Sequence, residues 1–437
     1  MNPLTKFIDA YQDNYARFHM PGHKGNCAFL EPLGGKRDIT EITHADDLYH
    51  AHGCIEAVER GFSAYYETES IISACGSTLC IQTMLALLAD REILAVRNAH
   101  SAFMNGCALC GIQPKWLPPI INPKTGLIAP ATALQIENCL NKYPDVSAVY
   151  ITSPDYYGQT ANLQEIAQLC CDRGILLAVD NAHGAHLHTL SPSQHPIAQG
   201  AHLCCDSLHK TLPSLTGAAL LHAKKGTFSR KEMKRKMALF GSTSPSYLIM
   251  ESAGLTLDYL IQYAEADWQK LQKKRNKLIK TLEENGYKLL KTEPSKLTID
   301  ANAIGLTGKE LFFCLHTDHM EAEYADNRYV VLMLSPFNSE EELKRLQELL
   351  ICLPKRETLQ QNPITQISSP NIVLPLRDAV FHSSVSVLVE QAVGNISADN
   401  LFTCPPGIPI LLAGEKVTPN IADILKGTGI KRVNVIK

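Results

Sequence analysis

Short apolar runs alternate with amphipathic stretches between residues 61 and 222. Six of the runs have strand length and are apolar on both faces: IISAC (71–75), EILAVR (92–97), SAVYITS (147–153), ILLAVD (175–180), AHLCCDS (201–207) and GAALLH (217–222). Helical patterns such as STLCIQTMLALLAD and LQEIAQLCCDRG separate them. Strands that are buried on both faces and joined by helices are typical of a largely parallel sheet covered on both sides. The pattern therefore predicts an α/β fold.

The large α/β domain is predicted to span residues 61–265. Residues 1–60, which are rich in Pro, Gly and His and show no sustained period, are predicted to form an N-terminal arm or linker. A long helical pattern from Tyr247 to about Asn285 leads away from the large domain.

A smaller α/β domain is predicted over residues 266–352, with strands at KLTID (296–300) and RYVVLML (328–334). Ser339 and Glu342 have capping-box spacing and mark the start of its last helix. The polar stretch 353–370 is predicted to be a linker. Residues 371–437, with the strand-like runs IVLPL and IPILLAG, are predicted to form a small C-terminal domain.

Composition narrows the classes of function. The chain has 437 residues and is 45% hydrophobic, so it can bury several cores. The 41 basic and 44 acidic residues give a net charge of −3, which does not favour a nucleic acid or an anionic membrane as partner. No apolar run has the length of a secretion signal or membrane span. The 14 cysteines are therefore expected to be reduced, mostly buried thiols in a cytoplasmic protein.

Polar residues follow the first two predicted strands. Gly76, Ser77 and Thr78 come after IISAC and open a helix. Backbone N–H groups and hydroxyls in that position bind phosphate, although simple capping of the helix explains the same residues. His100 follows EILAVR, and it fits both stacking on a flat cofactor and an ordinary loop position. Ligands of parallel sheets lie beyond the carboxyl ends of the strands, so we expect these residues in one pocket.

A carboxylate and a lysine follow two later strands. Asp180 ends ILLAVD, where a buried carboxylate needs a donor or cation such as a protonated pyridinium. Ala182 is small enough for a ring to lie against the chain. Lys210 stands between donors in Ser207-Leu208-His209-Lys210, and such surroundings lower a lysine pKa as a Schiff base requires. With the phosphate loop and the stacking histidine, these residues predict a site for pyridoxal 5′-phosphate (PLP).

Two other patterns point to different chemistry. His183, His186 and His188 are close in the sequence, as metal ligands often are. They lack helical i, i+4 spacing and a carboxylate or cysteine set to complete a zinc site, so no metal is predicted. The CxxC spacing of Cys107 and Cys110 has no second CxxC and no thioredoxin-type context, so packing on a helix is the preferred interpretation.

The motifs together resemble the fold-type-I, PLP-dependent ornithine/lysine/arginine decarboxylase family in its short form, without the N-terminal wing domain. The motifs that carry the resemblance follow one another along nearly the whole chain: HMPGHKG (19–25), DITEITHADDLYH (38–50), CGST (75–78), RNAHS (97–101), TSPDYYG (152–158), DNAHGAH (180–186), SLHKTLPSLTG (207–217), TSPSY (243–247), EPSKLTI (293–299) and CPPGIP (404–409). The resemblance implies a PLP-dependent transferase-like large domain, a smaller α/β domain and a small C-terminal domain.

The resemblance also implies a role for each matching residue. Lys210 would bind PLP as a Schiff base, Asp180 would pair with the pyridine nitrogen, and His183 would stand near the ring hydroxyl or the substrate carboxylate. The other implied cofactor contacts are His100 and Ala182 on the two faces of the ring, Gly76, Ser77, Thr78, Ser207 and His209 at the phosphate, and Ser244 at the phosphate of a neighbouring subunit. The family works as homodimers or larger homo-oligomers with sites at the subunit interface.

Three positions depart from the family pattern. Asn181 replaces the usual Glu after Asp180, Ser101-Ala102 stand where Lys-Ser is usual, and Thr403-Cys404 replace Pro-Tyr. The first change leaves Asp180 and its role intact. The other two lie at the pocket rim and bear on the choice of substrate more than on cofactor binding.

The predicted function is PLP-dependent decarboxylation of arginine, lysine or ornithine. A basic substrate needs an acidic partner for its distal cation, and the candidates are Asp46, Asp47, Glu321 and Glu323. The alternatives are another PLP reaction of aminotransferase or aldolase type, a decarboxylase-like regulatory protein, and a histidine-ligated metallohydrolase.

Overall fold

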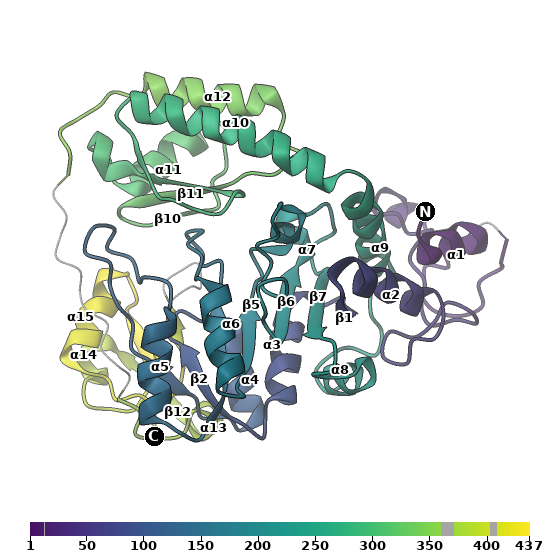
Figure 1. Ribbon diagram of the computed structural model, residues 1–437, viewed down its shortest axis with the longest axis horizontal. Coiled ribbons are helices and arrows are strands. Elements are labelled where there is room, and N and C mark those ends of the chain that lie inside the picture. The colour runs from purple at the N-terminus through teal and green to yellow at the C-terminus, as the bar shows by residue number, and fades with distance from the viewer. Residues whose placement is uncertain (13, 360–370, 403–408) are drawn as a thin grey trace.

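A seven-stranded sheet forms the centre of the computed structural model, which describes residues 1–12, 14–359, 371–402 and 409–437 (Figure 1). The strand order is β1-β7-β6-β5-β4-β2-β3. The strands are β1 (Thr68–Ser73), β2 (Glu92–Val96), β3 (Lys115–Leu117), β4 (Val146–Thr152), β5 (Leu176–Asp180), β6 (Leu203–Ser207) and β7 (Ala219–Lys224). Strand β7 runs antiparallel to β1 and β6, and the other neighbours are parallel. The predicted, largely parallel α/β sheet is confirmed.

Helices cover both faces of this sheet, as its apolar strands require. On one face α3 (Gly76–Leu87), α4 (Ser101–Cys110) and α8 (Arg230–Met237) share a core with side chains such as Tyr150. On the other face α5 (Ala133–Lys142) and α6 (Leu163–Asp172) pack on neighbouring strand residues such as Val149 and Ile151. Successive strand residues therefore enter different cores, which explains why both faces are apolar.

The N-terminal region contains more regular structure than its sequence indicates. It forms α1 (Pro3–Gln12), the 3-10 helix η1 (Ala28–Leu33) and α2 (Cys54–Tyr66). Leu4, Ile8 and Tyr11 line one buried side of α1, which packs on α2 and on α9 (Tyr247–Gln262). The prediction that the first fifty residues lack periodicity is therefore wrong for α1. This helix is short, but its apolar residues have helical spacing.

A second, smaller sheet follows two consecutive helices. The helical pattern expected from Tyr247 to Asn285 is broken at Tyr263, so that α9 ends there and α10 (Ala264–Glu284) begins. The second sheet is antiparallel, in the order β10-β11-β9-β8. Its strands are β8 (Lys288–Leu289), β9 (Lys296–Asp300), β10 (Tyr324–Ala325) and β11 (Tyr329–Met333), and its helices are η3 (Ala301–Ile304), α11 (Gly308–Thr317) and α12 (Glu340–Cys352). The predicted capping box of Ser339 and Glu342 is confirmed.

The C-terminal part contains two small two-stranded sheets. They pair β12 (Ser384–Leu388) with β15 (Arg432–Ile436) and β13 (Leu401–Phe402) with β14 (Pro409–Leu411), and the helices are α13 (Leu376–Phe381), α14 (Val389–Ala392) and α15 (Pro419–Gly427). The run IVLPL is not a strand, because Pro375 lacks the N–H that a strand would use and precedes the start of α13. IPILLAG contains β14 as expected.

Some predictions fall outside the described residues. These are residues 360–370 of the predicted linker and residues 403–408, which include Thr403, Cys404 and most of CPPGIP. The domain boundaries at 1–60, 61–265, 266–352 and 371–437 stay predictions.

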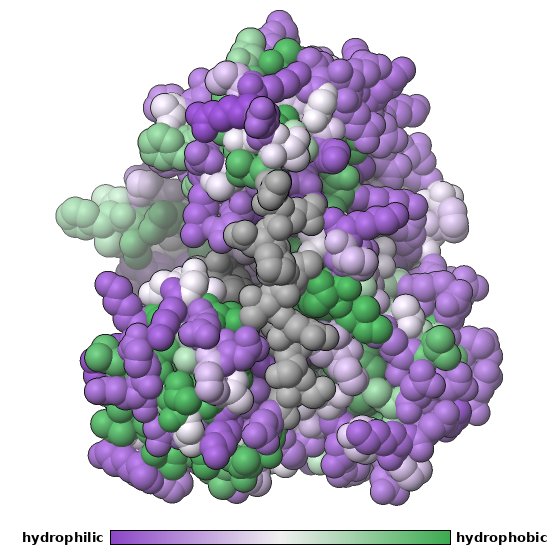
Figure 2. Space-filling model, turned by 90° about the vertical axis from the view of Figure 1, so that its left-hand side faces the viewer, coloured by the Kyte–Doolittle hydropathy of each residue, from purple (hydrophilic) through white to green (hydrophobic). Residues whose placement is uncertain are grey.

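The polarity of the surface and the length of the helices can be compared with those of membrane proteins. Polar and charged side chains cover most of the face shown in Figure 2, and apolar side chains form smaller groups among them. Within the described ranges, no helix is both long and apolar enough to cross a membrane. The predicted cytoplasmic location stays a prediction.

Candidate active site

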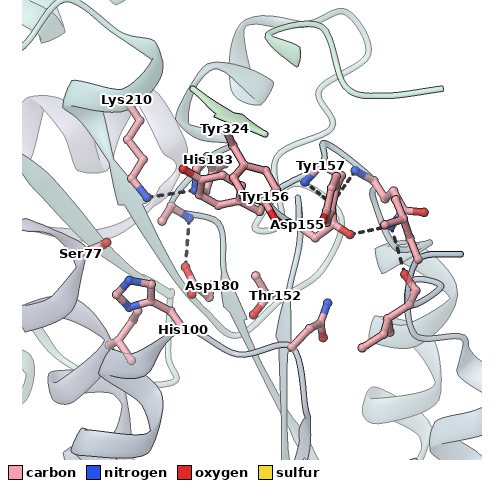
Figure 3. A pocket seen from close by; sticks show the side chains of 16 residues that line it. Ser77, His100, Thr152, Asp155, Tyr156, Tyr157, Asp180, His183, Lys210 and Tyr324 are labelled. Atoms are coloured by element: carbon pink, nitrogen blue, oxygen red, sulfur yellow. Dashed lines mark hydrogen bonds between the residues drawn. The ribbon is translucent and has the colours of Figure 1, made fainter. Parts of the chain in front are cut away.

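One pocket lies at the carboxyl ends of β2, β4 and β5, where the sequence places its candidate residues (Figure 3). Six predicted site residues line it together: Ser77, His100, Asp180, Ala182, His183 and Lys210. They come from the start of α3, the loops after β2 and β5, and the short helix α7 (Leu208–Thr211). Residues from four separate parts of the chain therefore meet as the parallel-sheet prediction requires.

The side chains of Lys210 and His183 are in direct contact in the pocket. The Lys210 Nζ lies 3.1 Å from His183 Nε2. Burial lowers the pKa of Lys210, while Asp180 and Glu323 oppose that change. Burial and the amines of Lys210 and Lys296 hold the pKa of His183 well below its usual range, so its ring is neutral at pH 7. A lysine with a lowered pKa beside a neutral imidazole has the properties of a nucleophilic amine.

Asp180 lies at the floor of the pocket as the last residue of β5, and it is only 3% exposed. Its carboxylate accepts hydrogen bonds from the backbone N–H of Ala182 at 3.1 Å and from the Tyr150 hydroxyl at 3.4 Å, and the Cys205 thiol lies 3.6 Å away. These donors are all neutral. A buried carboxylate with neutral donors is suited to a ligand that carries a positive charge.

His100 caps α4 and lines the pocket. Its Nδ1 accepts from the backbone N–H of Ala102 at 3.1 Å, so in the neutral ring Nε2 carries the proton. The start of this loop is held by Arg97, which is 2% exposed and donates to the carbonyl oxygen of Ile410 at 2.9 Å and to Glu415 at 3.3 Å. The C-terminal part thus fixes the loop that presents His100.

The N-terminus of α3 matches the predicted anion site in its geometry. Gly76 has a φ of +70°, which favours glycine, and no side chain caps the helix at Cys75. The simple-cap interpretation of Ser77 and Thr78 is therefore wrong. The buried Ser207 donates from Oγ to Ser77 Oγ at 2.8 Å, which brings a hydroxyl from β6 to the same helix end. The N–H of Gly76 donates to the Gly217 carbonyl oxygen at 2.7 Å, so the hydroxyls and the following N–H groups of this turn are the donors that suit an anion.

Five predicted cofactor residues lie outside the pocket lining: Gly76, Thr78, Ser207, His209 and Ser244. His209 Nδ1 lies 3.0 Å from the Ala218 carbonyl oxygen, and burial lowers the pKa of its ring. Ser244 is exposed, in the loop before α9. Their phosphate roles stay predictions.

Of the four acidic candidates for the substrate's distal cation, only Glu323 acts on the pocket within the described structure. Asp46 instead accepts from backbone N–H groups at the start of α2, including those of Gly53 and Ile55. Asp47 accepts from the backbone N–H of Tyr49, and Glu321 pairs with His316 at the exposed end of α11. Glu323 accepts from the pocket residue Tyr156 at 2.6 Å.

The pocket also contains residues after β4 that were not among the predicted site residues. Asp155, Tyr156 and Tyr157 line the pocket, and all three lie in the motif TSPDYYG at a strand end. Their position after a predicted strand was the available signal. Removal from water raises the pKa of Asp155 to about 6, although Gln159 and two backbone N–H groups oppose this. Lys296 was also missed, and it reaches the pocket through His183.

The three histidines considered for a metal do not converge. His183 faces the two lysines, His186 lies 2.8 Å from Glu293 and stacks on Trp268, and His188 lies 3.1 Å from the Tyr65 carbonyl oxygen. The CxxC cysteines lie on α4, where Cys107 is fully buried in the core, and the described cysteines form no disulfide. Helix packing of the CxxC pair is confirmed.

A different histidine cluster has ligand atoms close enough to hold a metal. Among the described residues, those of His195, Asp206 and His222 lie within 4.8 Å of one another. His195 and His222 lie 3.0 and 3.2 Å from Asp206 Oδ2, and Asn181 donates to Oδ1 at 2.7 Å. Burial raises the pKa of Asp206, but the two histidines lower it more. Hydrogen bonds account for this cluster, which links Asp206 of β6 to His222 of β7.

Comparison with known proteins identifies the family of this site. The sequence model described as "Orn/Lys/Arg decarboxylase, major domain" matches residues 2–338. The chain belongs to this family. An arginine decarboxylase of Halalkalibacterium halodurans is 29% identical over 95% of this chain and 91% of its own length, and one of Bacillus anthracis is 28% identical over 97% and 92%. The predicted enzyme class, an amino-acid decarboxylase, is confirmed.

Solved structures of lysine decarboxylases share the fold. That of Francisella novicida LdcF superposes with a TM-score of 0.83 over all of this chain and 81% of its own, at 17% identity. The constitutive enzyme of Escherichia coli gives a TM-score of 0.81 over 100% and 82%. The predicted fold class is therefore confirmed.

Proposed function

We propose that this decarboxylase acts on a basic amino acid, with PLP held covalently by Lys210. The observation that carries the proposal is the meeting of Lys210, His183, Asp180 and His100 in one pocket beside the N-terminus of α3. Arginine is the first substrate to test, because several relatives that match this chain over nearly their whole length are named arginine decarboxylases.

The pocket offers a matching partner for each end of the cofactor. The backbone N–H groups of Ser77 and Thr78 at the start of α3 and the hydroxyls of Ser77 and Ser207 suit the phosphate. The buried carboxylate of Asp180, bonded to neutral donors, suits a protonated pyridine nitrogen. His100 and Ala182, both in the lining, suit the two faces of the ring. The residues present therefore fit PLP.

Bound PLP would supply an electron sink for the pair left on the substrate's α-carbon when carbon dioxide departs. The chain's own residues would prepare that step. Asp180 would hold a proton on the ring nitrogen, and Lys210 would present an amine whose pKa is lowered by burial. His183 would stay neutral and hold a ring proton at the pocket. A proton must be delivered to the α-carbon after carbon dioxide leaves, and Lys210 and His183 are the donors we propose.

A subunit partner is part of the proposal. Ser244 is exposed in the single chain, so its proposed contact with a phosphate requires a neighbouring subunit. Phe18 and Phe29 in the N-terminal region are 96% and 93% exposed, and an interface would remove these rings from water. We therefore propose a homodimer or a larger homo-oligomer, with the pocket completed at the interface.

The test of the function is product analysis. The purified protein, loaded with PLP, is incubated separately with arginine, lysine and ornithine. We expect release of carbon dioxide with agmatine or a diamine for one of the three. Formation of a keto acid without carbon dioxide would overturn the proposal, because it would assign the site to transamination.

Glu323 is the acidic residue that we expect to recognise the substrate's distal cation. Replacing it with glutamine keeps an acceptor for the Tyr156 hydroxyl but removes the negative charge. We expect the KM for the preferred amino acid to rise about tenfold, with a smaller change in kcat. Steady-state kinetics of carbon dioxide release measure both constants.

Glu321 provides the matched control. It lies two positions away, is exposed and pairs with His316, so Glu321→Gln should leave the KM unchanged. An equal KM in the two variants would contradict the role of Glu323.

A further inference from the structure

Lys296 is a fully buried lysine that the proposed function does not use. It is the first residue of β9, in the smaller sheet, and its exposed fraction is 0%. Its Nζ lies 3.1 Å from His183 Nδ1 and 5.3 Å from the centre of the Tyr156 ring. It does not belong to the pocket lining, but it contacts two residues that do, His183 and Tyr156. A buried lysine is uncommon and needs a partner that stabilises it.

The His183 ring stands between two lysine amines. Nε2 lies 3.1 Å from Lys210, and Nδ1 lies 3.1 Å from Lys296. A neutral imidazole has one N–H and one lone pair. The ring nitrogen with the lone pair can accept from an ammonium, but the N–H needs an acceptor, and an ammonium has none. With His183 neutral, at least one of the two lysines must therefore be an unprotonated amine.

Carboxylates stabilise a positive charge on both amines: Glu293, Glu323 and Asp155 act on Lys296, and Asp180 and Glu323 act on Lys210. The positions of the two amines relative to the pocket, and the chemistry that each must perform, distinguish them. Lys296 and Glu293 both lie outside the pocket lining, so this pair does not change with what binds in the pocket. Lys210, by contrast, must have a free lone pair to react.

We propose that Lys296 is a positioning residue that sets the tautomer of His183. Its ammonium donates to Nδ1, so Nε2 carries the ring proton and donates it to Lys210, which is thereby kept as a neutral amine. This inference rests on the proposed role of Lys210 as the cofactor lysine. It gives the smaller sheet a part in the chemistry of the pocket.

The arrangement depends on pH. Burial lowers the pKa of Lys296 to about 8, against the opposing effect of the three carboxylates. The ammonium, and with it the hydrogen bond to Nδ1, is therefore present below about pH 8 and is lost as the pH rises above that value. The titratable groups that face this chain of three residues are Glu293, Glu323, Asp155, Asp180, Cys205, His100 and His209.

The test measures the protonation of Lys210 without cofactor or turnover. The apoprotein is acetylated with a small neutral reagent across a range of pH, and the extent of labelling at Lys210 is read by peptide mass spectrometry. Lys296→Met removes both the charge and the donor, so Lys210 becomes the ammonium that donates to Nε2. We expect the midpoint of Lys210 labelling to move up by about one pH unit or more.

Two further variants separate this role from a structural one. Lys296→Arg keeps a charged donor and should leave the midpoint within about 0.3 unit of the wild type. Lys234→Met removes another buried lysine. Its Nζ lies 2.9 Å from Glu59, and neither residue lines the pocket. This substitution should lower the unfolding temperature but not move the midpoint. An unchanged or lower midpoint in Lys296→Met overturns the inference.

A measurement on the unsubstituted protein covers the case in which Lys296→Met does not fold. Nitrogen-15 shifts of labelled histidine distinguish the two ring tautomers, and His183→Gln assigns the signal. We expect the proton on Nε2 below about pH 8, and a proton on Nδ1 there would overturn the inference. Trapping of PLP on a lysine other than Lys210 would overturn the proposed function while leaving these two readouts intact.

Discussion

Replacing Lys210 with alanine is expected to reduce decarboxylation by about 10⁴-fold or more and to abolish covalent attachment of PLP. The reason is the nucleophilic role that we propose for the Lys210 amine, whose pKa is lowered by burial and whose Nζ lies 3.1 Å from His183. Carbon dioxide release measures the first effect. Borohydride reduction followed by peptide mapping measures the second.

Two variants make this expectation specific. Lys210→Arg keeps the positive charge but has no nucleophilic amine, so it should be as inactive as Lys210→Ala. Lys224→Ala removes an exposed lysine at the end of β7 and should be fully active. Lys296 is the sharpest competitor, since it is the other buried lysine beside His183. Cofactor trapped on Lys296 would show that the two lysines have been assigned the wrong roles.

The large sheet was predictable because its strands are buried on both faces. Continuous apolar runs such as ILLAVD lack the polar face of a surface strand, so they are expected inside a covered sheet. They are also too short for the typical helix of a globular protein. The short edge strand β3 was not predictable, because Lys115–Leu117 has three residues and only Leu117 is buried. The break at Tyr263 was not predictable either, since neither Gly nor Pro marks it and tertiary packing sets the turn.

The candidate site was predictable where its residues follow strands of one sheet. His100, Asp180 and Lys210 converge because the carboxyl ends of parallel strands share an edge. Lys296 begins a strand of the other sheet, and its contact with His183 depends on how that sheet lies on the large one. No local pattern carries that information. The same holds for Glu323, one of four acidic candidates that the sequence could not distinguish.

Asn181, which stands where the family usually has Glu, forms a hydrogen bond with a buried carboxylate outside the pocket lining. The Asn181 amide donates to Asp206 at 2.7 Å, and Asp206 also binds His195 and His222. A glutamate at 181 would place a second carboxylate against Asp206 without a proton to share. Asn181 thus donates to Asp206, which lies outside the pocket lining, and Asp180 remains part of that lining.

Replacing Asp180 with asparagine is expected to lower kcat/KM by about 100- to 1000-fold while leaving PLP attached to Lys210. The amide keeps the shape of the side chain and an acceptor for the Ala182 N–H, but it has no charge to hold a proton on the ring nitrogen. Asp180→Ala should be at least as impaired. Asp145→Asn, at an exposed position, is the control and should be fully active. Decarboxylation that continues unimpaired in Asp180→Ala would contradict the proposed role of the carboxylate. Another group would then have to keep the ring nitrogen protonated.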